Sequence, residues 1–181
     1  MTHIKNILFR SGFGYVWIAQ DVGDVKLFIV KFKQRLFDTL QQNWCSSVNN
    51  LSDTFYYKHY KSLLNVERYL TYEIPVYLKV IYTRFRCSNF RLAIDQGRYN
   101  KITYTERLCP YCLDHGLRYI EDELHTLLVC KRYSVLRDHY ISKFIKNHSF
   151  QTFIDIMTSE NLDVLFNVCL YLYNVQKLRK A

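Results

Sequence analysis

The sequence predicts a small, irregular, mainly α-helical domain, and three observations lead to this fold class. Apolar residues recur at spacings of three and four along several segments, the pattern of amphipathic helices, whereas no series of strands is evident. Hydrophobic residues make up 49% of the 181 residues and aromatic residues 17%, so the chain can bury a core. Two prolines and five glycines leave little sequence for linkers.

The first predicted helix covers residues 24–46, with Asp24 as its N-cap. Its apolar stripe consists of Leu27, Val30, Phe32, Leu36, Phe37, Leu40 and Trp44. The two asparagines at 49–50 indicate a break, and a short aromatic helix is expected to start at Ser52 or Asp53.

A second long helix is predicted from Ile74 to Cys87, because Pro75 suits a first helical turn. The residues expected to face the core are Val76, Val80, Ile81 and Phe85. The cations expected to point away from it are Lys79, Arg84 and Arg86. Residues 97–105 are expected to form a loop.

The remaining chain is predicted to form helices at 121–130, 133–146, 150–157 and 161–179, with a short extended piece at 117–120. This pattern suggests three segments. A helical region covers 1–100, a ligand-rich segment covers 101–147, and a C-terminal helical pair at 148–181 packs on the rest.

The formal net charge is +9, and its densest excess lies between residues 79 and 107. Such a basic patch attracts polyanions such as nucleic acid, with solubility alone as the alternative. Aromatic residues alternate with these cations, as on surfaces that stack bases and neutralise phosphates. The residues expected to bind RNA or DNA are Lys79, Arg84, Arg86, Arg91, Arg98, Lys101 and Arg107. A second contact is expected at Lys131, Arg132 and Arg137.

The chain has six cysteines, and its first residues lack the long apolar run of a secretory signal peptide. We therefore expect an intracellular, reducing environment, in which clustered cysteines bind metal before they form disulfides. No apolar run reaches the length of about 18 residues that a membrane span requires, so no membrane partner is expected.

Four residues follow the pattern C-x2-C-x12-H-x4-C, namely Cys109, Cys112, His125 and Cys130. This spacing is typical of closed tetrahedral zinc sites. Because four protein ligands leave no position for water, we expect a structural Zn2+ ion and not a catalytic one. The alternative is ordinary buried thiols with a core histidine. The expected fold is thus a helical domain with an embedded CCHC segment like a zinc knuckle.

Spacing also constrains the local structure around these ligands. Five residues along an ideal helix correspond to about 140° of rotation, so Cys130 must lie where the helix of His125 ends or unwinds. The acidic residues 121–123 fit the first turn of that helix, where they complement its dipole; a nuclease metal cluster is the alternative. His115 is an alternative ligand. The cysteines expected to be small buried apolar residues are Cys45, Cys87 and Cys169.

The sequence lacks the usual signs of catalysis. It contains no glycine-rich phosphate loop, no G-x-S-x-G elbow and no H-E-x-x-H pair. We therefore expect that the protein is not an enzyme by itself.

Several runs carry a resemblance to a known family, most specifically IEDELH at 120–125 with Cys130 and Tyr133. The other runs are GFGYVW at 12–17, FKQRL at 32–36, FRCSN at 85–89, GRY at 97–99 and ERLC at 106–109. Through these residues the chain resembles the C-terminal zinc-binding region of non-LTR retrotransposon reverse transcriptases of invertebrate mobile elements. In that family the region follows the polymerase and helps to hold template RNA or target DNA.

The paired aspartates of the polymerase core and an endonuclease domain are absent from the sequence. The resemblance therefore implies a detached tail without polymerase activity, with nuclear residence. The leading expectation is a zinc-stabilised module that binds RNA or DNA. The alternatives are a protein-interaction or scaffold module that packs on a polymerase core, and a functionless fragment of an element.

Overall fold

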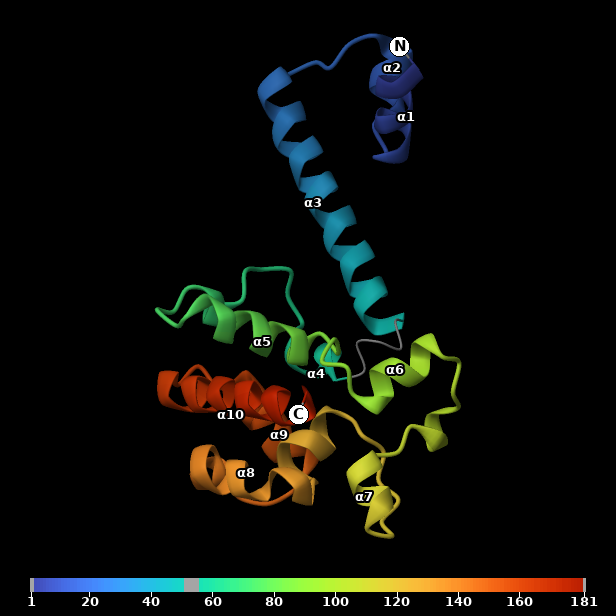
Figure 1. The fold of residues 1–181 in the computed structure, drawn as a ribbon. Helices are drawn as coiled ribbons and strands as arrows, with labels where there is room; N and C mark the ends of the chain where they lie inside the picture. The colour runs from blue at the N-terminus through green and yellow to red at the C-terminus, as the bar shows by residue number, and fades with distance from the viewer. Residues whose placement is uncertain (1, 51–55, 181) are drawn as a thin grey trace. The chain divides into compact units, whose positions relative to one another are not determined.

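The computed structural model describes residues 2–50 and 56–180, and these residues form helices and turns (Figure 1). Within them, β-pairing is limited to an isolated antiparallel bridge between Leu108 and Ile120. The mainly α-helical prediction is therefore confirmed. The chain divides into two compact units, residues 1–50 and 51–181, called here the first and second units.

The first unit contains α1 (Thr2–Arg10), α2 (Gly14–Ala19) and α3 (Val25–Asn50). A small aromatic cluster joins them, because the Phe13 ring lies 5.5 Å from Phe28 and 5.4 Å from Phe32. Gly14 permits the close approach of α1, since a Cβ there would lie 2.9 Å from the Phe9 ring. The sequence analysis predicted neither α1 nor α2.

Helix α3 confirms the helix predicted at 24–46 and extends it to Asn50. Asp24 is its N-cap, as expected, because its Oδ1 accepts a hydrogen bond from the Leu27 amide at 3.1 Å. The predicted apolar stripe is largely exposed, with Leu36 at 44% and Leu40 at 57%. The proposed helix start at Ser52 or Asp53 lies outside the described residues.

The second unit is built around its last helix. Its α-helices are α4 (Tyr57–Tyr60), α5 (Val76–Arg86), α6 (Ala93–Tyr99), α7 (Pro110–Asp114), α8 (Ser134–Tyr140), α9 (Phe150–Thr158) and α10 (Leu162–Lys180). Helix α10 packs against α5, α8 and α9, and Figure 1 shows α5 and α10 side by side. One buried core runs from Tyr56 to Val175 and includes the three cysteines of the CCHC set, and His125 is buried as well. None of the described helices combines the length and apolar character that crossing a bilayer requires.

The orientation predicted for α5 is partly wrong. Val76 is 74% exposed and Val80 is 42% exposed, although both were expected to face the core. The residues of α5 that are buried are Leu78, Ile81, Tyr82, Phe85 and Arg86. The apolar residues of α5 are distributed around most of its circumference, so their spacing alone could not identify the face that packs against the core.

The loop predicted at 97–105 begins later, because α6 continues through Gly97 to Tyr99. A Cβ at Gly97 would lie 2.5 Å from the Arg107 side chain, so glycine allows Arg107 to pack on the helix. The last three predicted helices are confirmed as α8 with a following 3-10 turn (Ser142–Phe144), α9 and α10. The expected boundaries at residues 100 and 147 stay predictions.

Candidate metal centre

A short hairpin positions the first cysteine of the CCHC set. The Cys109 amide donates to the Tyr119 carbonyl at 2.8 Å, and the Glu121 amide donates to the Arg107 carbonyl at 3.0 Å. These bonds flank the Leu108–Ile120 bridge, which lies at the last residue of the extended piece predicted at 117–120. Helix α7 starts directly after Cys109 and presents Cys112 one turn later.

A π-helical turn (His125–Val129) positions the other two residues. The Asp122 Oδ1 caps it by accepting from the His125 amide at 2.7 Å. The Cys130 amide donates to the His125 carbonyl at 2.8 Å, an i→i+5 bond. Because such a turn closes after five residues, it brings Cys130 back over His125. The inference that Cys130 lies where the helix ends is confirmed.

The four ligand atoms of Cys109, Cys112, His125 and Cys130 lie within 4.8 Å of one another, and all four residues are buried. The Cys130 sulfur is 3.8 Å from that of Cys109 and 4.0 Å from that of Cys112, and the Cys112 sulfur is 3.4 Å from His125 Nε2. Tetrahedral zinc places two sulfurs about 3.8 Å apart, and a sulfur and a nitrogen about 3.6 Å apart. The cluster could therefore hold a metal ion, and its geometry is compatible with zinc.

The backbone stabilises negative charge on the sulfurs. Amide groups of Cys112, Lys131 and Arg132 donate to the sulfurs of Cys109, Cys112 and Cys130, respectively. A hydrogen bond with the Cys130 thiol is the main cause that lowers the pKa of Cys109 to about 3. Burial raises the pKa of Cys112. The main cause that raises the pKa of Cys130 is the hydrogen bond that its thiol donates to Cys109, and burial raises this pKa further. A bound dication would favour the deprotonated form of all three thiols.

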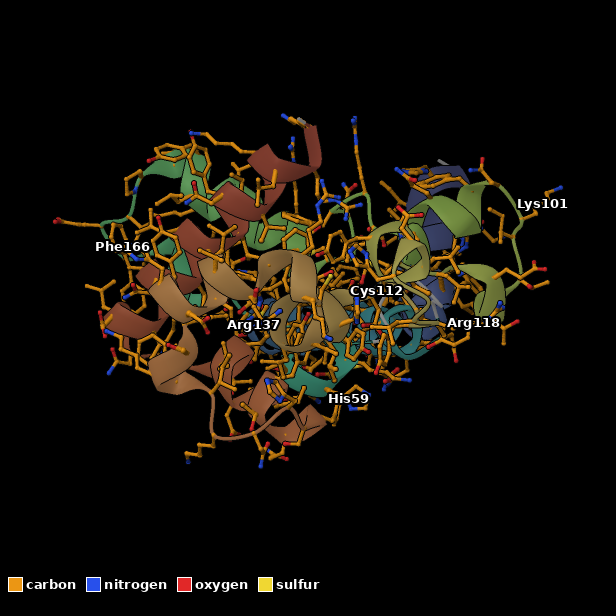
Figure 2. All side chains as sticks on the ribbon, turned by 60° about the horizontal axis from the view of Figure 1, so that its bottom comes forward. His59, Lys101, Cys112, Arg118, Arg137 and Phe166 are labelled. Carbon is orange, nitrogen blue, oxygen red and sulfur yellow. The ribbon has the colours of Figure 1, made fainter. Side chains whose placement is uncertain are left out.

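Arg137 supports the ligand-bearing turn from behind. It is 8% exposed, and it donates from Nε to the Leu127 carbonyl at 2.9 Å and from Nη2 to the Cys130 carbonyl at 2.8 Å. Figure 2 labels Arg137 on α8 and Cys112 on α7 near the middle of the view. Arg137 was expected to be a secondary nucleic-acid contact, but its donors are used internally.

The remaining thiols and the alternative ligand lie apart from this cluster. Cys169 is buried as predicted, and burial raises its thiol pKa to about 12. Cys45 is half-buried and Cys87 is exposed, so the prediction of burial is wrong for Cys87. His115 is exposed, and its Nδ1 lies 2.7 Å from the Tyr111 carbonyl, so it does not replace a ligand here.

The acidic residues 121–123 have separate structural roles. Asp122 caps the π-turn and accepts from the Tyr56 hydroxyl at 2.6 Å. Glu121 forms an ion pair with Arg179. Glu123 is 2% exposed, and burial raises its pKa to about 7. Within the described residues, the only His, Cys, Asp or Glu group that could hold a metal is the CCHC set, so nothing supports the nuclease-cluster alternative.

Three of the seven cations predicted to bind nucleic acid are exposed, namely Arg84, Arg91 and Lys101. Figure 2 shows Lys101 at the periphery of the view. The other four contact their own unit. Lys79 Nζ donates to a backbone carbonyl at 2.9 Å, Arg107 Nη2 does the same at 2.9 Å, and Arg98 pairs with Asp95 at 2.6 Å.

Arg86 is the clearest departure from expectation, because it is 4% exposed and lies inside an aromatic cage. Its guanidinium lies 4.4 Å from the Tyr60 ring centroid, pairs with Glu67 at 3.3 Å and donates to the Met157 carbonyl. The prediction that Arg86 points away from the core is therefore wrong. Its charge is compensated within the fold and does not face solvent.

Arg84 and Arg91 line a cleft of about 470 Å³ together with Arg179 and Lys180 from the end of α10. The sequence analysis missed the last two, because it searched for a patch contiguous in sequence. The available signal was the basic last turn of the helix predicted at 161–179. No protein-family model matches this chain, and neither do the curated proteins or the solved structures with which it was compared.

Proposed function

We propose that the second unit is a zinc-stabilised module that binds RNA or DNA and has no chemistry of its own. The zinc part rests on the buried CCHC cluster, whose spacing suits a tetrahedral ion. All four coordination positions come from side chains, so the ion would hold α7, the hairpin and the π-turn together. Because no coordination position is left for a water molecule, the cluster suits a structural ion and not a catalytic one.

The single observation that carries nucleic-acid binding is the exposure of Arg84, Arg91 and Lys101 on or beside α5 and α6. The buried core beneath these elements includes Phe85, Leu92 and the three cysteines of the CCHC set. Cations on fixed elements can neutralise phosphates and release condensed counterions. The resemblance to reverse transcriptase C-terminal regions supports the same ligand class and suggests a shared origin.

Binding of labelled single-stranded RNA and DNA, measured by fluorescence anisotropy across salt concentrations, tests this proposal. Three phosphate contacts predict that log K falls against log salt with a slope of about −2. The triple variant R84E/R91E/K101E should abolish binding. Lys146 is an exposed cation after α8, and the control variant Lys146→Glu should retain most of the nucleic-acid affinity. Absent binding, or binding indifferent to salt, would refute the proposal.

A second candidate function is a protein-interaction module, and the exposed apolar side chains of the first unit favour it. On α3 alone these are Val25, Leu27, Ile29, Val30, Leu36, Phe37 and Leu40. Apolar side chains gathered in this way often mark protein interfaces. A pull-down that survives nuclease treatment and is lost in the L36K/L40K variant would support this candidate, and nuclease-sensitive capture would contradict it.

A further inference from the structure

The cleft of about 470 Å³ brings together cations from three separate parts of the second unit. Arg84 comes from the last turn of α5, Arg91 from the α5–α6 connection, and Arg179 and Lys180 from the last turn of α10. The rest of the lining is Asn89, Phe90, Gln96 and Gln176. The described lining is therefore cationic and amide-bearing, without a carboxylate.

Charge balance inside the cleft is incomplete. Glu121 compensates the charge of Arg179, with Arg179 Nη2 and Glu121 Oε2 3.2 Å apart. Because Glu121 directly follows the Leu108–Ile120 bridge, this ion pair connects Arg179 to the hairpin of the metal site. Cations at the C-terminal ends of α5 and α10 also complement the helix dipoles. This structural role does not extend to Arg91, which belongs to neither helix. Converging cations repel one another, so an anionic ligand would stabilise the arrangement.

The backbone at Arg91 gives an independent argument. Its φ is +59°, in the left-handed region that glycine adopts without strain. The flanking amides of Phe90 and Leu92 both donate to Asp95 Oδ2 at 3.1 Å, and the Arg91 carbonyl accepts from Arg179 Nη2 at 2.9 Å. The fold thus holds Arg91 in a conformation that glycine would adopt with less strain, and the side chain at this position lines the cleft.

We propose that this cleft binds neighbouring phosphate groups of a polyanionic ligand, with Arg84, Arg91 and Lys180 as the contacting cations and Arg179 as a further donor. Its volume lies within the range of small-molecule sites and accommodates more than one phosphate. The asparagine and glutamine amides add neutral donors for the remaining oxygens. The inference deepens the proposed function by naming the place where nucleic-acid phosphates bind, and it rests on that function for the identity of the polymer.

Calorimetric titration of the full chain with inorganic triphosphate tests the cleft without a polynucleotide. We expect one triphosphate per chain, which displaces a labelled single-stranded oligonucleotide. Arg84→Ala and Lys180→Ala should each weaken triphosphate binding about tenfold, the size expected for losing a charge-assisted hydrogen bond. Lys146→Ala, the matched exposed control, should not change it.

Arg91→Gly separates ligand binding from folding. This substitution relieves the left-handed strain, so its melting temperature should equal or exceed that of the parent while triphosphate affinity falls. Triphosphate that does not bind, or that binds Arg84→Ala and Lys180→Ala as tightly as the parent, would overturn the inference.

The two proposals fail in different ways. Triphosphate binding that needs Arg84 and Lys180, without any oligonucleotide binding, would support the cleft and refute nucleic-acid binding. Oligonucleotide binding that is lost in Lys101→Glu and unchanged in Arg84→Ala and Lys180→Ala would retain nucleic-acid binding and refute the cleft.

Discussion

Replacing Arg137 with alanine should both destabilise the second unit and weaken metal binding. The side chain is 8% exposed and donates two hydrogen bonds, to the carbonyls of Leu127 and Cys130, at 2.9 and 2.8 Å. The variant leaves two buried carbonyl groups without these donors, at a cost of about 1–3 kcal/mol each. We therefore expect a loss of roughly 2–6 kcal/mol in the free energy of unfolding.

The same substitution acts on the metal site because Cys130 follows the turn that Arg137 holds. Loss of a residue that orients a ligand typically lowers metal affinity about 10–100-fold. Urea denaturation gives the unfolding free energy, and competition with a chromophoric chelator gives the zinc affinity. Arg118→Ala, an exposed arginine near α7, is the matched control and should change stability by no more than about 0.5 kcal/mol. An Arg137→Ala variant that matches this control in both assays would refute the reasoning.

Three further substitutions test other parts of the second unit. Cys169→Ala should cost only about 1 kcal/mol in urea denaturation and leave metal content unchanged, because this buried thiol lies outside the cluster; lost metal would contradict the assignment. Gly97→Ala should lower stability by about 1–3 kcal/mol, since the new Cβ would lie 2.5 Å from Arg107, and unchanged stability would argue against this packing. Glu121→Gln should lower the free energy of unfolding by about 1.5–3 kcal/mol, because the paired Arg179 loses its charged acceptor. The Arg179 side chain is partly exposed, so this loss should be smaller at high salt. A neutral result would show that the pair contributes little.

The metal cluster could be predicted from the sequence because its information is local. The C-x2-C turn, the capped helix start and the spacing from His125 to Cys130 all lie within residues 109–130. Rotation per residue alone placed Cys130 beyond the helix, and the structure adds the π-turn that achieves this. Asp24 as the cap of α3 is a second case in which a local hydrogen bond determined the element's start.

Features that depend on partners distant in sequence could not be predicted in the same way. Helix α5 is apolar around most of its surface, so its inward face is chosen by contact with α10. Arg86 looked like a surface cation because its partner Glu67 and the neighbouring Tyr60 ring lie outside the basic run. Gly97 suggested a loop, whereas its lack of a side chain makes room for Arg107.

The central claim is that a zinc ion bound by Cys109, Cys112, His125 and Cys130 holds the second unit together. Elemental analysis of the purified chain, with thermal melts before and after chelation, tests it most directly. We predict one zinc per chain and a melting temperature that falls on chelation, because structural zinc contributes roughly 10–16 kcal/mol in small modules. A metal-free protein that melts at the same temperature with and without chelator would contradict the claim.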